Sequence, residues 1–275
     1  MARTYLVLDQ NMFRSPELQA LVDSDRNSHF IVIDEALLEM CKSAQWESTL
    51  RRSLAILSRF PARVRMTMST ADALRWEMAN KKSISGRFVD KEATNFLREI
   101  LVGLRDGEDS AGLERMRAGM MQTHVELGAD QLNHSANKNQ LVALVDVTRS
   151  IGDESFLKSL RNNSLPRHEK LKAIRDLSPK LIDHFFTEAG FVENEVKSFV
   201  SQHPLVLRRT YIRLWRCWDW LAKGGLESLP DEKVTNENFD QDYVAIATFF
   251  GGIVSKEHKV NETYEDIAWI VRNRN

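Results

Sequence analysis

Short, continuous apolar runs near both ends of the chain constrain its fold more than any other feature. Tyr5–Leu8 ends at Asp9, Phe30–Ile33 lies one helix-length later, and Gly252–Ser255 follows a Gly-Gly turn near the other end. Runs of about four apolar residues are typical of parallel strands that are buried on both faces. The two ends of the chain are therefore expected to build one sheet.

Helical patterns separate these runs. Ser15 followed by Pro16 is typical of an N-cap and a first helical residue, and Ser69 begins a capping-box pattern. Apolar residues recur at helical spacing between residues 36 and 44. This alternation predicts an α/β fold with a parallel sheet and right-handed crossovers. Residues 63–68 alternate weakly and are expected to form an edge strand.

The middle of the chain has almost wholly helical patterns. They cover residues 92–104, 141–151, 171–186 and 211–221, and the last of these is followed by two glycines. Breaks are expected at residues 106–109 and 228–231. We therefore predict a discontinuous α/β domain, residues 1–84 and 236–275, interrupted by an all-helical insertion, residues 85–235.

Net charge, cysteine content and the length of apolar stretches bear on nucleic-acid binding, redox environment and membrane insertion. The net charge is −1, so global charge does not indicate a nucleic-acid binder and any such contact needs a local basic patch. Cys41 and Cys217 lie in amphipathic segments and are expected to be buried free thiols, which suits a reducing cytoplasm. No stretch reaches the roughly 18 apolar residues of a membrane span, so no membrane partner is expected.

Acidic residues gather where the predicted strands end. Asp9 follows the first strand, Asp34 and Glu35 follow the second, and Ser255 and Glu257 follow the last. In open parallel sheets, ligands bind beyond the carboxyl ends of the strands. Converging carboxylates repel one another, and a divalent cation relieves that repulsion. An all-oxygen shell favours Mg²⁺ or Mn²⁺.

The order of these motifs resembles that of PIN-domain nucleases. The segment around Asp9 and Asn11 is similar to the family's opening strand, and Glu39 falls at its second acid, with Asp34 replacing the usual proline. The segment from Phe239 to Ala247, with Asp240 and Asp242, is similar to the third motif, an acid opening an Ala-rich helix. The segment ending at Glu257 is similar to the final strand, where the family more often has Asp. The resemblance covers roughly residues 1–80 and 236–275.

The resemblance implies Mg²⁺- or Mn²⁺-dependent hydrolysis of RNA phosphodiesters, in an endoribonuclease of the kind that serves as a toxin or defence effector. A metal-activated water would attack, so the protein would supply no covalent nucleophile. The implied catalytic and metal-binding residues are Asp9, Glu39, Asp242 and Glu257. The implied supporting residues are Asn11, which would orient Asp9 or a bound water, Asp240 and Ser255.

Basic residues near the helical segments could form a phosphate-binding rim beside this site. An ordinary solvated helix face explains them equally well. The Trp-rich stretch 215–220 could stack bases, but core packing of an amphipathic helix is the favoured interpretation. The candidate RNA-binding residues are Lys81, Lys82, Arg87, Arg208, Arg209 and Arg213, with Arg216 beside them.

Two other functions fit the same sequence. The chain could be a catalytically inactive PIN-like scaffold whose helical block binds a protein regulator or a second copy of the chain. Alternatively, Asp9 after the first strand resembles aspartyl-phosphate enzymes. Those enzymes need a second acid two residues later, where this chain has Asn11, so this alternative ranks third.

Overall fold

The computed structural model describes residues 3–107, 110–131, 134–151, 154–162, 164–223 and 240–273. The chain divides into two compact units. The sheet unit comprises residues 1–75, 84–128 and 246–261, and the helical unit comprises residues 76–83, 129–245 and 262–275. Both units are discontinuous. Compared with the expected division, residues 85–128 belong to the sheet unit, and residues 76–83, 240–245 and 262–275 belong to the helical unit.

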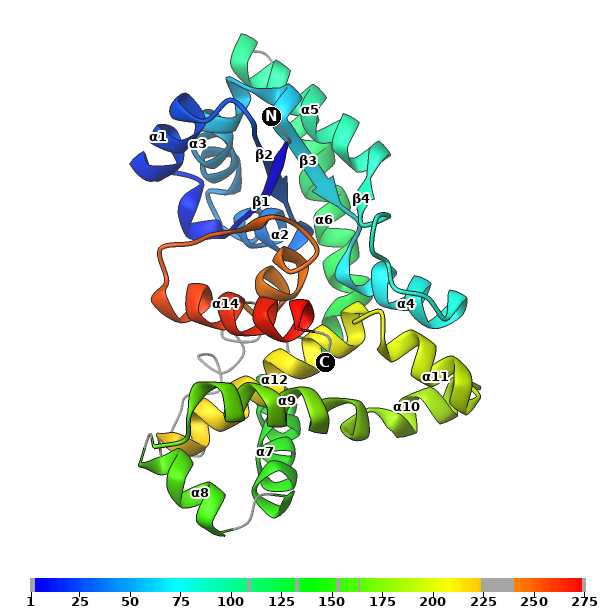
Figure 1. Ribbon diagram of the computed structural model, residues 1–275. Coiled ribbons are helices and arrows are strands. Elements are labelled where there is room, and N and C mark those ends of the chain that lie inside the picture. The colour runs from blue at the N-terminus through cyan, green and yellow to red at the C-terminus, as the bar shows by residue number, and fades with distance from the viewer. Residues whose placement is uncertain are drawn as a thin grey trace. The chain divides into compact units, whose positions relative to one another are not determined.

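A five-stranded sheet forms the centre of the sheet unit, so the α/β class is confirmed (Figure 1). Its order is β4-β3-β2-β1-β5, and every pairing is parallel except that of β4. The first residues of the chain thus pair with residues from its far end, as the apolar runs predicted. The strands are β1 (Thr4–Leu8), β2 (Ser28–Val32), β3 (Val64–Thr67), β4 (Val89–Asp90) and β5 (Gly252–Val254).

The expected edge position of residues 63–68 is wrong. Strand β3 lies between β2 and β4, with Met66 opposite Asp90 in the antiparallel pair. Strand β4 has only two residues, too few for a periodic pattern, and it lies inside the stretch that was expected to be wholly helical. Thr94 adds a further bond to β3, since its hydroxyl accepts from the Met66 backbone N–H at 2.9 Å.

Local capping signals explain where several helices of the sheet unit begin and end. The Ser15 hydroxyl accepts from the Leu18 N–H at 3.0 Å, and the Asp90 carboxylate accepts from the Ala93 N–H at 2.9 Å. Gly107 ends a helix with φ of 88°, which glycine adopts without strain. The elements are η1 (Gln10–Met12), α1 (Pro16–Ser24), α2 (Asp34–Cys41), α3 (Trp46–Ser58), η2 (Pro61–Arg63), α4 (Thr70–Asn80), α5 (Lys91–Asp106) and α6 (Ser110–Gln131).

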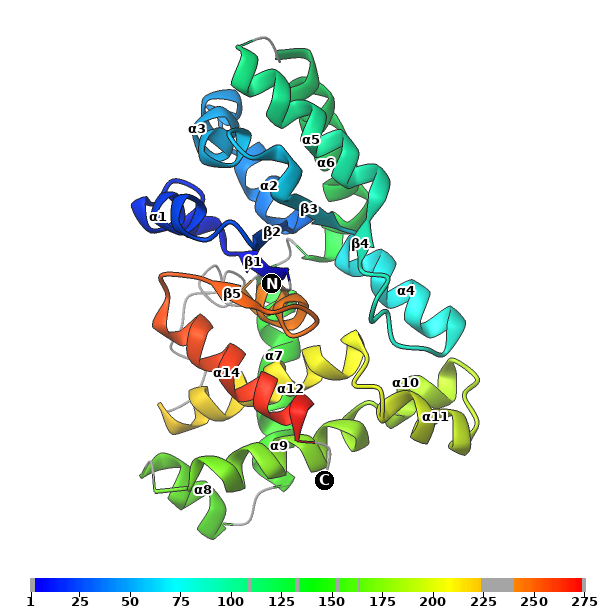
Figure 2. The ribbon, with the colours of Figure 1, turned by 45° about the horizontal axis from the view of Figure 1, so that its top comes forward.

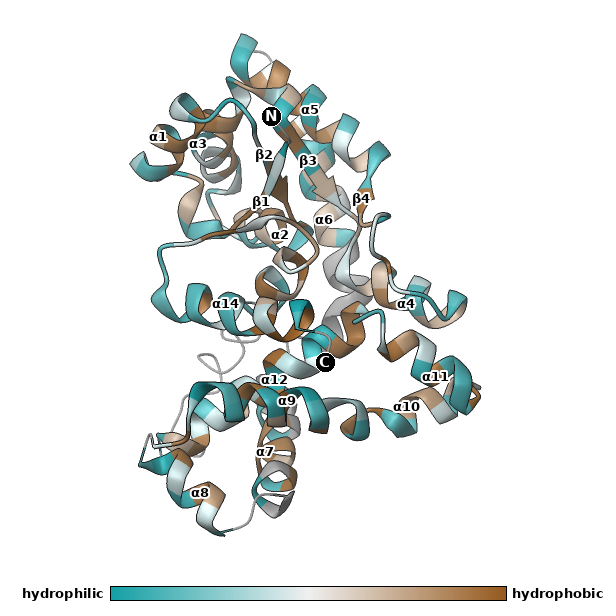
Figure 3. Ribbon diagram, in the orientation of Figure 1, coloured by the Kyte–Doolittle hydropathy of each residue, from teal (hydrophilic) through white to brown (hydrophobic). Residues whose placement is uncertain are grey.

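Packing of the sheet unit follows its apolar pattern. Helix α5 packs against β3 and α3, and α3 packs against α2, which Figure 2 shows as neighbours. Figure 3 shows brown and teal residues alternating along α5, which is consistent with one buried face. That buried face includes Leu97, Ile100 and Leu101.

Gly251 holds strand β5 close to β1. A Cβ at this position would meet the Thr4 Cγ2 atom and the Tyr5 carbonyl oxygen at 3.0 Å each, while the Gly251 N–H donates to that carbonyl at 2.8 Å. We expect Gly251→Ala to lower the free energy of unfolding by about 2 kcal/mol, because the backbone oxygen cannot move aside cheaply. Urea denaturation measures this. Gly119→Ala, in open space on a helix, is the matched control and should not destabilise the fold.

The helical unit is built around a long, buried helix, α12 (Leu205–Ala222). It contacts α7 (His134–Ile151), α8 (Glu154–Arg161) and α9 (Arg167–Leu181). Trp215, Trp218 and Trp220 are at most 2% exposed. This confirms core packing of the Trp-rich stretch and excludes it as an open stacking surface. The remaining helices are α10 (Asp183–Glu188), α11 (Glu193–Val200), a helix over residues 240–247 and α14 (His258–Arg272).

The run expected over residues 171–186 is two helices, α9 and α10, with a break at Ile182. Pro179 lies in the last turn of α9 and has no N–H to continue the helical ladder. The glycines at 224–225 and the break expected at 228–231 lie outside the described residues. Cys41 and Cys217 are buried free thiols, as predicted. Among the described helices, none is long and apolar enough to cross a membrane.

Candidate functional site

Asp9 lies at the carboxyl end of β1, where the sheet topology was expected to place a functional acid. Strand β1 is flanked on both sides, by β2 and β5, so its end opens at the middle of the sheet edge. The Asp9 N–H donates to the Val254 carbonyl at 3.1 Å, which extends the pairing with β5 by one residue. The side chain is buried, with 5% of the residue exposed.

Asn11 connects the two ends of the chain at this point. Its amide nitrogen donates to Asp9 Oδ2 at 2.8 Å and to Glu257 Oε1 at 3.3 Å. Its amide oxygen accepts from the Lys256 N–H at 3.3 Å. One amide group therefore holds a carboxylate that follows β1 and a carboxylate that follows β5 within reach of each other.

Ser255 completes this network. Its hydroxyl donates to Asp9 Oδ2 and accepts from the Glu257 N–H at 3.0 Å. The Ser255 carbonyl accepts from the Asn261 amide at 2.9 Å, which ties the turn to the first residues of α14. We call Asp9, Asn11, Ser255 and Glu257 the carboxylate pair site. All four residues belong to the sheet unit.

The surroundings of Asp9 disfavour the negatively charged form of its carboxyl group. Burial raises the pKa of Asp9 above its ordinary value, and the nearby Glu257 carboxylate raises that pKa further. The hydrogen bond from Ser255 acts in the opposite direction and favours the charged form. A buried carboxylate facing a second carboxylate is the situation that a divalent cation stabilises.

Glu39 and its neighbours lie on α2. Glu39 is half-buried, and it is one turn beyond Glu35, which is also on this helix. Burial and then the Asp34 carboxylate raise the pKa of Glu35 well above its ordinary value. The Thr70 hydroxyl donates to Glu35 Oε1 at 2.7 Å. Burial thus disfavours the charged form of Glu35, which we interpret as a structural acid. Its Thr70 partner lies 35 residues along the chain, so no short sequence pattern marks the contact.

Asp242 and Asp240 both lie within the helix over residues 240–247, and Asp242 belongs to the helical unit. Asp242 forms a two-pronged ion pair with Arg209 of α12. The Arg209 Nε lies 2.8 Å from Asp242 Oδ1, and its second nitrogen donates to Oδ2 at 3.4 Å. Since Asp242 is 8% exposed, the guanidinium neutralises a buried carboxylate. Sequence reasoning assigned Arg209 to a phosphate rim and missed this pairing.

No three or more His, Cys, Asp or Glu side chains gather into a metal-holding group anywhere in the part of the chain that the structure describes. The structure therefore brings Asp9 together with Glu257. It does not bring Asp9, Glu39, Asp242 and Glu257 into one described group.

The candidate RNA-binding residues have different environments. Lys81 contacts Glu195 at 2.6 Å, and the Arg208 Nε donates to the His203 carbonyl at 2.6 Å. Lys81, Arg208 and Arg209 are thus engaged within the helical unit. Lys82 and Arg87 are exposed, as a phosphate-binding role requires, and Arg216 is buried. Part of Arg213 reaches the surface, but burial of its guanidinium lowers the pKa of Arg213 to about 10.

The chain was compared with protein families, curated proteins and solved structures. No family model, no curated protein and no solved structure matches the chain.

Proposed function

We propose that this chain is a divalent-metal-dependent ribonuclease whose carboxylate pair site binds Mg²⁺ or Mn²⁺. The observation that carries the proposal is the Asn11 amide, which donates to Asp9 and Glu257 from opposite ends of the chain. A fold that needed only to neutralise these acids could use a lysine or arginine at this position. An amide instead positions both carboxylates and leaves their charge available to a cation.

The donor set suits this class of ion. Mg²⁺ is commonly bound through one or two carboxylates and keeps several waters, to which substrate phosphates add. Asp9 and Glu257 supply two carboxylates, one buried and one exposed, at the carboxyl end of a central parallel strand. Glu39, which belongs to the same unit as the carboxylate pair site, is proposed as a further ligand.

Bound metal would supply an activated water and neutralise charge on the scissile phosphate. Asp9 would act from a fixed position, because Asn11 and Ser255 restrain the same carboxylate oxygen. Glu257 is exposed, and it can turn toward substrate or solvent water. Lys82 and Arg87, which are exposed, and Arg213 are proposed as contacts to the RNA backbone.

A cleavage assay tests the proposal directly. We expect the purified chain to cut a labelled single-stranded RNA in Mg²⁺ or Mn²⁺, and to lose the activity in EDTA. Electron paramagnetic resonance of Mn²⁺ should show binding that Glu257→Gln weakens by about tenfold or more, since one charged ligand is removed. Glu92→Gln, which removes an exposed carboxylate of α5, is the matched control. If the chain neither binds Mn²⁺ nor cleaves RNA at high Mn²⁺ concentration, the proposal is wrong.

An inactive scaffold is the second candidate, and the Arg209–Asp242 ion pair favours it. An arginine that neutralises the third acid reduces the charge left for a metal. Under this alternative, calorimetry detects no Mg²⁺ or Mn²⁺ binding to a chain that still unfolds cooperatively.

A further inference from the structure

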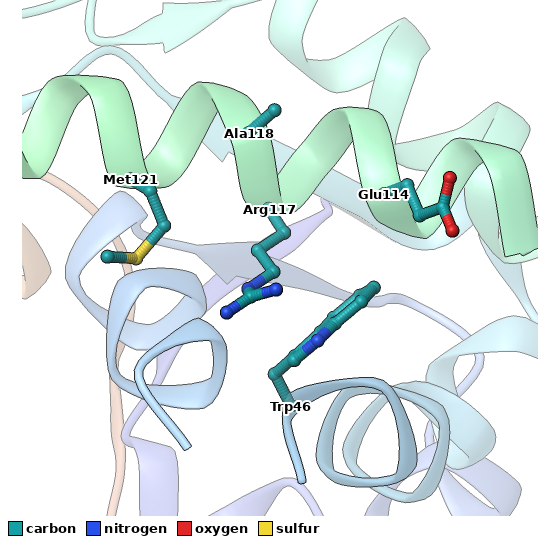
Figure 4. Close-up of a pocket in the computed structure, with 5 residues that line it drawn as sticks. All are labelled: Trp46, Glu114, Arg117, Ala118 and Met121. Carbon is teal, nitrogen blue, oxygen red and sulfur yellow. The ribbon is translucent and has the colours of Figure 1, made fainter. Parts of the chain in front are cut away.

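A cavity on the sheet unit lies beneath one face of α6, away from the carboxylate pair site in sequence. Its volume is about 380 Å³, and Figure 4 shows the five side chains that line it. Four of them recur at i, i+3, i+4 and i+7 on α6, which places them on one side of that helix. The fifth is Trp46, the first residue of α3. The lining residues are Trp46, Glu114, Arg117, Ala118 and Met121.

Arg117 extends from α6 over the Trp46 indole. Its guanidinium carbon lies 4.8 Å from the ring centroid, at the distance of a cation–π contact. Its Nε atom is buried and has no hydrogen-bond partner within the described residues. Buried donors are nearly always satisfied, so a donor without a partner beside an open cavity points to a ligand that supplies an acceptor.

Neighbouring side chains do not neutralise this guanidinium. Burial raises the pKa of the nearby Cys41 thiol to about 11, so the thiol carries no charge at neutral pH. Glu114 is exposed one turn away, and Figure 4 shows its carboxylate directed away from Arg117. Within the described ranges, Arg117 forms no ion pair with any acid. The charge of Arg117 is therefore available to an anion that enters the cavity.

The walls of the cavity are held in place before a ligand arrives. The Arg51 guanidinium bonds Glu47 Oε1 at 2.9 Å and the Ser110 hydroxyl at 2.9 Å, which joins the first turns of α3 and α6. Trp46 precedes Glu47 directly, so this contact fixes the helix start that carries the indole. Preformed walls reduce the entropy that binding costs.

We propose that this cavity binds a nucleotide, with its phosphate on Arg117 and its base against the Trp46–Arg117 stack. Bases stack on aromatic rings and on guanidinium planes, and guanidinium donors match phosphate oxygens. Glu114 at the rim accepts from a base amino group or a ribose hydroxyl. A cavity of this size lies in the range of small-ligand sites. The nucleotide comes either as a free mononucleotide or as one residue of a single strand.

Binding of adenosine 5′-monophosphate in EDTA tests this proposal by calorimetry. We expect saturable binding that Arg117→Gln and Trp46→Leu each weaken by about tenfold, since each removes one phosphate or stacking contact. Arg115→Gln is the matched control, because Arg115 is an exposed cation of the same helix that lies over Phe96 instead. Circular dichroism of each variant checks that the fold is retained.

Two further probes identify the source of the ligand. If a hexaadenylate binds more tightly than the mononucleotide, with the same dependence on Arg117, the site is assigned to single-stranded nucleic acid. If it binds equally or more weakly, the site is assigned to free nucleotides. Inorganic phosphate that binds as tightly as the mononucleotide overturns the proposal, as does unchanged binding in Arg117→Gln. The nucleotide proposal does not rest on the ribonuclease function. Because nucleotide binding is measured in EDTA, its outcome is independent of the metal-dependent cleavage assay.

Discussion

Asp9→Asn is expected to abolish Mg²⁺-dependent RNA cleavage, lowering the rate by at least about 100-fold, and to leave the fold at least as stable as before. Substitutions in the groups that merely surround metal ligands cost about 10- to 100-fold, so loss of a charged ligand should cost no less. Asn11 and Ser255 can still donate to an amide oxygen at position 9. The geometry would then persist while the charge that binds the cation is lost.

Asp9→Asn is expected to raise, and not to lower, the stability of the fold near neutral pH. Because burial and Glu257 raise the pKa of Asp9 in the fold, the folded protein binds this proton more readily than the unfolded chain does. The charged form therefore destabilises the fold near neutral pH, and protonation relieves the penalty as pH falls through the raised pKa. An amide is neutral at every pH. The melting temperature of Asp9→Asn should exceed that of the wild type at pH 7, and the difference should vanish in acid.

Asp23→Asn is the matched control for this substitution. It makes the same chemical change in the same unit, at an acid that is half-exposed and paired with Arg59 at 3.5 Å. Such surface pairs contribute little to stability, so neither cleavage nor melting should change by much. Cleavage by Asp9→Asn at the wild-type rate contradicts the ribonuclease proposal. A lower melting temperature at pH 7 contradicts the account of its electrostatics.

The parts of the fold that were predictable from sequence are those with local causes. Strands β1, β2 and β5 overlap the continuous apolar runs near the two ends of the chain, and such runs are typical of strands buried in a parallel sheet. Ser15 and Ser69 begin helices because each hydroxyl bonds an N–H three residues on. The proximity of Asp9 and Glu257 also follows, since parallel strands end at one edge of their sheet.

The parts that were not predictable depend on partners far along the chain. Strand β4 has two residues, and only its pairing with β3 makes it a strand. Arg209 and Asp242 are 33 residues apart, and neither position carries a pattern that predicts an ion pair. The same holds for Arg117 and Trp46, although the helical spacing of Glu114, Arg117 and Met121 could have indicated a shared face. The packing of α5 on β3 likewise joins residues from distant parts of the chain, and no local pattern in residues 91–106 indicates it.

Glu77→Ala is expected to lower the free energy of unfolding by about 3 kcal/mol, the largest stability effect among these predictions. Glu77 is fully buried in the helical unit, and its carboxylate accepts from the Leu205 N–H at 2.8 Å and the Val206 N–H at 3.2 Å. These are the first N–H groups of α12, whose N-cap residue Pro204 provides no side-chain cap. The carboxylate also complements the positive end of the helix dipole.

Removal of this carboxylate leaves two N–H groups of the central helix, one buried and one part-buried, without this acceptor. Urea denaturation measures the loss, and Glu77→Gln separates its causes, because an amide oxygen can still accept from one N–H but carries no charge. We expect Glu77→Gln to fall between the wild type and Glu77→Ala. Glu92→Gln, at an exposed acid of α5, should change the free energy of unfolding by less than about 0.5 kcal/mol. A loss below about 1 kcal/mol in Glu77→Ala would show that α12 begins without this cap.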